Sequence, residues 1–460
     1  MRFCFSIILL AVLLLGAAAG QAAAHVIDEA VTLGFNGWLA PFGDSGAEEY
    51  TDVWAEGNLA YLGTVGSGVA VINLDTGAYE SGVLKNPEFV TAYAPAGHAD
   101  FQDVKVDNGI GYFSGGSGTD IVDLSAASAP ALLTRIGAAQ GGFPSTKNAA
   151  VGGGYLYQVS TTSSEIRVFD VSVPASPSLV RSIDTNDPIG LHDATLQGDR
   201  LYVAGAGGGS YVYDVAGVGA TEPLLQVAAP TGAATSSVWP TANGDKLVVT
   251  HHEPGGELSL WDIASTPTLL DSQSAGDMGF NSYSTSEVAV VGSLAYVAWS
   301  QGGLQVVDLD NTEESGMQRA GYYTIVGSGA PTSLTGVRSV YPFLGWDQVL
   351  ASDTKRGLWR FDSSMLNTHP VGDYNLDGQV DTLDYDTWAS HYGSASPYVD
   401  GNGDGVVDAA DFTVWRDAYT AATATPSAIQ APEPTTYALI LLGLLAAVSD
   451  RRLTLGRSPQ

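Results

Sequence analysis

The sequence has a single cysteine, Cys4, and few basic residues. Cys4 falls in a segment that we expect to be removed, which leaves no cysteine for a disulfide, a thiolate metal site or a cysteine nucleophile. Lysine and arginine total 18 against 49 aspartates and glutamates, giving a formal net charge of −31. A surface with this charge repels phosphate backbones, so we expect no nucleic acid partner.

Long apolar runs occur only near the two ends of the chain. Near the start, Arg2 precedes an apolar run over residues 3–15, and small residues then lead to Ala22-Ala23-Ala24. A charged start, a short apolar segment and an A-x-A site are typical of a secretory signal peptide, here residues 1–24. A retained anchor is the weaker interpretation, because a spanning helix needs about 20 apolar residues.

Between the two ends, the chain repeats a pattern of short strands and glycine-rich turns. The 56 glycines and 21 tyrosines favour short strands over long helices. Each repeat ends its third strand in an acid or amide, at spacings of 44 to 54 residues. These strand-end residues are Asn73, Asp123, Asp170, Asp214, Asp262, Asp308 and Asp362. Seven units of this length match four-stranded blades, so we predict an all-β, seven-bladed propeller over residues 25–367.

The repeats resemble LVIVD-type propeller repeats, in particular those of the choice-of-anchor B family. The resemblance is carried by YTDVWAEGNLAYLGT near the start and by VAWSQGGLQVVDLDN, SVYPF and LASDTKRGLWRF near the end. It implies a propeller at the cell surface and no particular activity. The segment VIDEAVTLGF, residues 26–35, is expected to supply a strand that closes the ring.

One position of the first strand in each blade carries a polar or aromatic residue. Counting nine residues back from the Tyr or aliphatic of the second strand gives Asp52, Asp103, Asn148, Asp193, Trp239, Glu287 and Tyr341. First strands line the channel of a propeller, so we expect these residues to form a ring, with His192 adjacent. Two interpretations are open. The ring binds a cation, with a sugar stacked on an aromatic face, or its members bond the backbone of the next blade, as buried polar groups usually do.

Two twelve-residue loops after the propeller place oxygen donors at alternate positions, which is the spacing that wraps ligands around one calcium ion. Glycine at position six allows the sharp turn in both loops. The predicted ligands are Asp373, Asn375, Asp377, Gln379, Asp381 and Asp384 in the first loop, and Asp400, Asn402, Asp404, Val406, Asp408 and Asp411 in the second. Gln379 and Val406 would contribute backbone carbonyls.

The region 368–422 resembles a type I dockerin, whose calcium loops end in Asp rather than Glu. The resemblance implies an α-helical module with bound Ca²⁺ and a cohesin as partner. Dockerins bind cohesins through hydroxyl residues at loop positions ten and eleven. Of the four such positions only Thr382 carries a hydroxyl, so cohesin is the partner that the resemblance supports least.

The end of the chain has three parts in order. A linker over residues 423–434 ends in Pro432-Glu433-Pro434, and residues 435–460 contain the apolar run YALILLGLLAAV and a basic pair. This order resembles a PEP-CTERM tail, which implies an exosortase-type sorting enzyme and a final location at the envelope surface or in the extracellular matrix. Twelve residues of helix span about 18 Å against a bilayer core of about 30 Å, so we expect this apolar helix to anchor the protein only transiently.

No catalytic constellation is present in the sequence. His251-His252-Glu253 lacks the second histidine of a zinc-protease helix and is expected in a loop at the blade rim. The leading hypothesis is an exported, non-catalytic binding or scaffolding protein whose partner is a polysaccharide or a surface protein. The alternative is a glycoside hydrolase or accessory factor in polysaccharide catabolism, which would need two carboxylates facing each other across a cleft.

Overall fold

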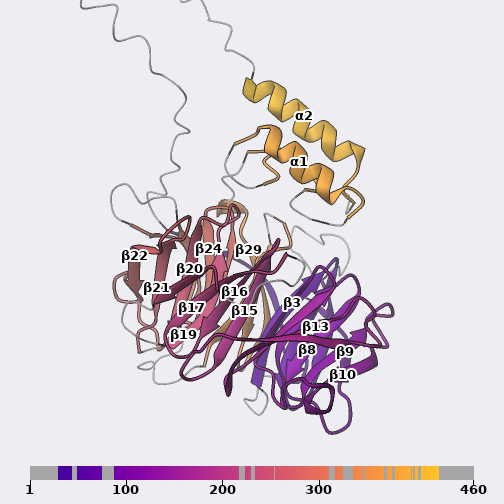
Figure 1. Ribbon diagram of the computed structural model, residues 1–460. Helices are drawn as coiled ribbons and strands as arrows, with labels where there is room; N and C mark the ends of the chain where they lie inside the picture. Colours follow the sequence, from indigo (N-terminus) through magenta and orange to yellow (C-terminus); the bar gives the residue numbers. More distant parts are fainter. Residues whose placement is uncertain are drawn as a thin grey trace, which may run out of the picture.

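A computed structural model describes residues 30–423, apart from 44–48, 75–86, 217–222, 229–233, 253, 310–315, 325–334, 346–347, 367–369, 376–378, 395, 397–398 and 402–405. The described chain forms seven sheets arranged as a propeller, followed by a pair of helices (Figure 1). The predicted leader, the linker with its PEP motif and the C-terminal apolar helix lie outside the described residues. Within the described part, no helix is long and apolar enough to cross a bilayer.

The first four blades each contain four antiparallel strands that follow one another along the chain. Blade one has β3 (Glu49–Glu56), β4 (Leu59–Val65), β5 (Val69–Asn73) and β6 (Glu88–Tyr93). Blade two has β7 (Phe101–Asp107), β8 (Ile110–Gly115), β9 (Gly118–Asp123) and β10 (Ala131–Ile136). Blade three has β11 (Asn148–Gly152), β12 (Tyr155–Ser160), β13 (Ser163–Asp170) and β14 (Ser178–Asp184). Blade four has β15 (Leu191–Gln197), β16 (Arg200–Gly205), β17 (Gly209–Asp214) and β18 (Leu225–Ala228).

The last three blades share this plan, with a change at the closure. Blade five has β19 (Ala234–Pro240), β20 (Lys246–His252), β21 (Glu257–Asp262) and β22 (Thr268–Ser274). Blade six has β23 (Val288–Val291), β24 (Leu294–Trp299), β25 (Gly303–Asp308) and β26 (Gln318–Tyr323). Blade seven has β27 (Val337–Tyr341), β28 (Gln348–Asp353) and β29 (Gly357–Asp362). Its fourth strand comes from the beginning of the described chain.

The ring closes through two N-terminal strands. Strand β2 (Gly34–Leu39) pairs antiparallel with β29 and completes blade seven, while β1 (Val31–Thr32) pairs in parallel with β26 of blade six. The closing strand therefore begins near the end of the predicted segment 26–35 and continues beyond it. Hydrogen bonds between the two ends of the propeller sequence hold the ring shut.

The predicted acid or amide is the last residue of the third strand in all seven blades. In blade two, Asp123 Oδ1 accepts the backbone N–H of Ser125 at 2.9 Å. Four other blades make the same bond two residues on, with the pairs Asp170–Ser172, Asp214–Ala216, Asp262–Ala264 and Asp362–Ser364. A short acidic side chain that bonds the backbone two residues ahead forms a turn, which is why the strand stops there.

The core lies between neighbouring blades. Tyr61, Tyr157 and Tyr202 of the second strands are at most 2% exposed, and Val159 of blade three packs with Leu191 of blade four. Burying a large apolar side chain contributes about 1.5–3 kcal/mol, so each blade is stabilised mainly by its neighbours. This packing fixes the first strands around one axis and thereby positions the side chains that face the channel.

Candidate functional site

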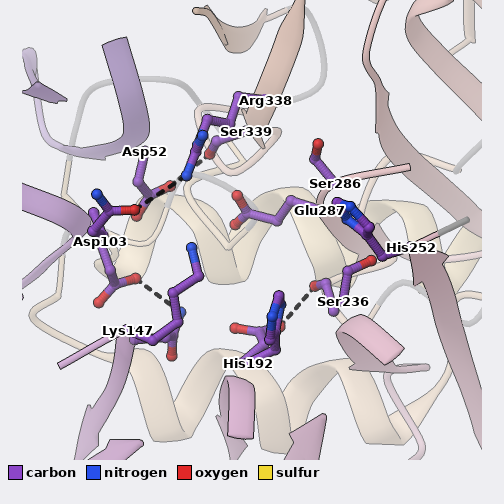
Figure 2. Close-up of a pocket in the computed structure, with 14 residues that line it drawn as sticks. Asp52, Asp103, Lys147, His192, Ser236, His252, Ser286, Glu287, Arg338 and Ser339 are labelled. Carbon is purple, nitrogen blue, oxygen red and sulfur yellow. Dashed lines mark hydrogen bonds between the residues drawn. The ribbon is translucent and has the colours of Figure 1, made fainter. Parts of the chain in front are cut away.

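One end of the central channel opens into a cavity of about 190 Å³ (Figure 2). All fourteen residues that line it are of polar types. The lining residues are Asp52, Gln102, Asp103, Lys147, Asn148, His192, Asp193, Ser236, Ser237, His252, Ser286, Glu287, Arg338 and Ser339.

Five of the seven predicted ring residues, and His192, line this cavity. The prediction placed Trp239 and Tyr341 there as well, and the structure corrects it. Trp239 stacks on Phe343 with ring centroids 5.2 Å apart, and the Tyr341 hydroxyl donates to the carbonyl of Ala55 at 2.6 Å. Ser237 and Ser339 occupy the ring positions of blades five and seven. We call the seven residues the belt: Asp52, Asp103, Asn148, Asp193, Ser237, Glu287 and Ser339.

The error arose from the length of the first hairpin. In blades one to four and in blade six, two residues separate the first and second strands. In blade five the gap is 241–245, and in blade seven it is 342–347. In these two blades, counting nine residues back from the aliphatic residue of the second strand therefore reaches a residue two positions after the true ring position. Trp239 pairs with Val248, the position that Thr195 takes opposite Tyr202 in blade four.

The belt joins each blade to the next. At six of its seven positions the side chain accepts a backbone N–H from the following blade, always from the residue just after the next belt position. The pairs are Asp52–Val104 at 2.8 Å, Asp103–Ala149 at 3.0 Å, Asn148–Ala194 at 3.1 Å, Asp193–Val238 at 3.2 Å, Ser237–Val288 at 3.4 Å and Ser339–Val53 at 3.3 Å. The bond from Ser339 to Val53 crosses from the last blade to the first, so the belt also closes the ring.

A second set of side chains reaches the cavity from the residue just before the belt position, and in five blades the first strand bulges there. In blade four, Leu191 pairs with Gly205 and Asp193 with Ala204, so His192 is the extra residue. The register shifts at the corresponding point in blades one, two, five and seven. A bulge turns an additional side chain toward the same side of the strand. We call this set the mouth residues: Gln102, Lys147, His192, Ser236, Ser286 and Arg338.

Basic side chains at this site were not predicted from the sequence. Lys105 Nζ lies 3.0 Å from a carboxylate oxygen of Asp52, also bonds Asp103, and stands 5.0 Å from the centre of the Trp54 ring. It supplies the positive charge that we expected a bound cation to supply. In the described part of the chain, no group of three His, Cys, Asp or Glu side chains is arranged to hold a metal ion.

Burial shifts the ionisation of the groups around the cavity. It raises the pKa of Asp103 and Asp193, and it raises the pKa of Glu287 well above its usual range, with Asp52 adding to that effect. Burial and the neighbouring Arg338 lower the pKa of Lys147 to about 8. These shifts bring the carboxylates and Lys147 closer to neutrality, because a low-dielectric site disfavours every charge.

Burial lowers the pKa of both histidines at the mouth. Burial, and then the positive charge of Lys147, lower the pKa of His192 to about 4. His252 also has a lowered pKa, mainly through burial, and it is the last residue of β20 rather than part of a rim loop as expected. Both imidazoles are therefore neutral near pH 7 and can donate and accept hydrogen bonds. A polar residue precedes the belt position in all seven blades, and this was the sequence signal for the mouth residues.

The second candidate site is the helical pair, α1 (Thr382–His391) and α2 (Ala409–Thr423). Residues 376–378 and 402–405 lie outside the described residues, and with them the predicted ligands Asp377, Asn402 and Asp404. The position-twelve carboxylates, Asp384 and Asp411, are fully buried. Asp384 accepts N–H groups from Tyr374, Asn375 and Asp381 at 2.7–3.0 Å.

Carboxylates that converge in this way away from water require compensating positive charge. Asp373 and Asp384 of the first loop are both buried, and oxygen donors of this kind are the ligands that calcium prefers. A bound calcium ion would neutralise these carboxylates. The described residues supply donors of the type that calcium binds but form no group of three, and calcium binding stays a prediction.

Comparison with known proteins agrees with the fold. The described chain is a seven-bladed β-propeller that contains LVIVD repeats, and these repeats match residues 145–185 in blade three and 284–323 in blade six. The Pan2 WD40 domain of Neurospora crassa is similar in structure, with 14% identity, a TM-score of 0.53, and coverage of 73% of this chain and 96% of that one. The RRP9 WD40 repeats give 12% identity, a TM-score of 0.51, and coverage of 69% and 94%. At this identity the likeness concerns the fold alone. No curated protein matches the chain.

Proposed function

We propose that this protein is exported and acts at the cell surface or in the extracellular matrix as a non-catalytic binding protein, with its ligand in the channel cavity. The observation that carries the proposal is a difference between the two sets of side chains at the channel. The belt residues are largely engaged in bonds between blades, whereas the mouth residues face a cavity that those bonds do not fill. A polysaccharide or a surface protein bearing such a ligand is the partner that this location favours.

The two ends of the chain support export. The leader over residues 1–24 and the PEP-CTERM-like tail over 435–460 are consistent with secretion followed by processing at Pro432-Glu433-Pro434 by an exosortase-type enzyme. The dockerin-like module between propeller and tail would bind two calcium ions. A calcium-ordered module suits an attachment or spacer role, because the ion compacts loops rich in like charges.

Binding is better supported than hydrolysis. A retaining or inverting glycosidase needs two carboxyl groups free to face the substrate, about 5–9.5 Å apart. Asp52, Asp103 and Asp193 each accept a backbone N–H of the next blade, and Lys105 also holds the first two. These carboxylates are committed to the structure of the ring. No specific observation favours the alternative of an enzyme in polysaccharide catabolism.

An array of glycans and small metabolites, probed with the secreted, calcium-loaded protein, tests the proposal. We expect retained ligands to be lost when Lys147→Ala and Arg338→Ala are combined. The matched control is Lys355→Ala with Arg356→Ala, which removes the same charges from the propeller outside the cavity. Ligands that bind equally well to both double variants would overturn the assignment of the cavity, as would a protein that binds nothing on the array.

A further inference from the structure

The cavity also indicates the chemical class of its ligand, an inference that rests on the binding function proposed above. We propose that the channel mouth takes a small polyhydroxylated molecule with a single carboxylate, such as a sugar acid, and that Lys147 and Arg338 hold the carboxylate.

Two basic side chains face the cavity and retain hydrogen-bond donors for a ligand. Arg338 donates one N–H to Gln102 Oε1 at 3.2 Å, and a guanidinium has five donors in all. Among the described residues, the Lys147 ammonium has no hydrogen-bond partner. Figure 2 shows both side chains reaching into the cavity from different sides. In a chain with only 18 lysines and arginines, two that converge on one opening require an explanation.

Arg338 destabilises the positive charge of Lys147. Arg338 is, after burial, the largest influence that lowers the pKa of Lys147. Like charges that share a dry site are stabilised when an anion lies between them. A carboxylate would accept hydrogen bonds from both groups, and a guanidinium matches the geometry of its two oxygens.

The deeper carboxylates limit the ligand to one negative charge. Asp52 and Asp103 share the single positive charge of Lys105, and Asp193 accepts bonds from Ser237 and Val238. The raised pKa of Glu287 favours its uncharged form. A monoanion adds only one negative charge above these acids, whereas a phosphate dianion would add two and be repelled more strongly.

The size of the cavity and the residues that line it indicate the nature of the rest of the ligand. A cavity of about 190 Å³ is somewhat larger than one of about 150 Å³ that holds benzene, which suits a single sugar ring. All its lining residues are of polar types, so every one of them can offer a hydrogen bond to the ligand. Neutral His192 and His252, together with Ser236 and Ser286, offer donors and acceptors for hydroxyl groups.

Calorimetric titration of the secreted protein with glucuronate tests the inference, with glucose, glucose 1-phosphate and alanine as comparisons. We expect glucuronate to bind at least tenfold more tightly than each comparison. Lys147→Met and Arg338→Met should each weaken glucuronate at least tenfold and glucose by less than twofold. Lys355→Ala with Arg356→Ala should leave both affinities unchanged, and unaltered melting temperatures of the mouth variants would exclude misfolding.

The outcomes separate this inference from the proposed function. If a neutral, zwitterionic or doubly charged ligand binds more tightly than glucuronate and is lost in the mouth variants, the cavity is a binding site and the ligand class is wrong. If glucuronate binds but neither mouth variant weakens it, the assigned residues are wrong. If nothing binds in the cavity, both proposals fail.

Discussion

The indole N–H of Trp388 donates a hydrogen bond of 2.9 Å to the backbone carbonyl of Asp408 in the second predicted calcium loop. Trp415 makes the equivalent bond of 2.8 Å to Asp381, so the two halves of the helical module are joined by a reciprocal pair. Each tryptophan stands four residues past position twelve of its own loop and bonds position nine of the other. This relationship couples the two predicted ion sites through the backbone that carries their ligands.

Trp388→Phe should therefore affect the second loop more than the first. The substitution keeps an aromatic ring and leaves the Asp408 carbonyl without its donor, which costs about 1–3 kcal/mol when the group is buried. We expect a lower melting temperature of the module and weaker calcium binding at one of two sites in a calorimetric titration. Tyr392→Phe, which changes an exposed tyrosine, is the control, and equal effects from both substitutions would contradict the coupling.

The calcium sites should be lost one at a time. Asp373→Ala and Asp400→Ala each remove the first ligand of one loop, so titration should show one site in either variant and none in the double variant. The loop carboxylates repel one another without the ion, so chelator should reduce the helical signal in far-UV circular dichroism. Asp386→Ala, an exposed acid of α1 outside both predicted ligand sets, should change neither result. A helical signal insensitive to chelator would rule out the module as predicted.

The belt should behave as a structural element. Asp103→Asn combined with Asp193→Asn weakens acceptors for the N–H groups of Ala149 and Val238 and removes one partner of the buried Lys105. We expect a loss of about 3–5 kcal/mol of unfolding free energy, because an ion pair is broken in the interior. The exposed pair Asp199→Asn with Asp386→Asn is the control. Unchanged stability together with lost ion binding would instead support the cation interpretation of the ring.

Ligand binding at the mouth should weaken at alkaline pH. Lys147 is charged below its pKa of about 8 and neutral above it, so affinity for glucuronate should be full near pH 6.5 and fall through pH 8 to 9. Arg338 keeps its charge and leaves residual binding. Lys147→Arg should remove the decline, because arginine stays protonated throughout this range. An affinity for the unmodified protein that is flat between pH 6.5 and 9.5 would show that Lys147 does not hold the ligand. The groups that act on this lysine are Asp103, His192, Asp193, His252, Glu287 and Arg338.

The ends of the mature protein are open to direct measurement. We expect the secreted form to begin at His25 and to end near Pro434, since a twelve-residue apolar helix is too short for a lasting anchor. Intact-mass and peptide mass spectrometry of the secreted protein determine both ends. A peptide that contains residues 441–448 in the secreted form would show that the tail is retained.

The sequence by itself determined the number of blades and the ends of their third strands. Asp123 and its equivalents act locally, through a bond to the backbone two residues ahead. Their spacing could therefore be recognised from the sequence alone. The same is true of the loop spacing around Asp384, where every predicted ligand lies within twelve residues. Patterns of this kind depend on neighbours along the chain.

Tertiary structure decided the composition of the channel site. Ser237 and Ser339 replace Trp239 and Tyr341 in the belt because two hairpins are longer than the others. His192 faces the cavity because a bulge interrupts the alternation of its strand. Lys105 meets Asp52 from about fifty residues away, and the packing of adjacent blades sets that distance. Register, bulges and contacts between blades arise only when the ring closes, and they determine which charges face the ligand.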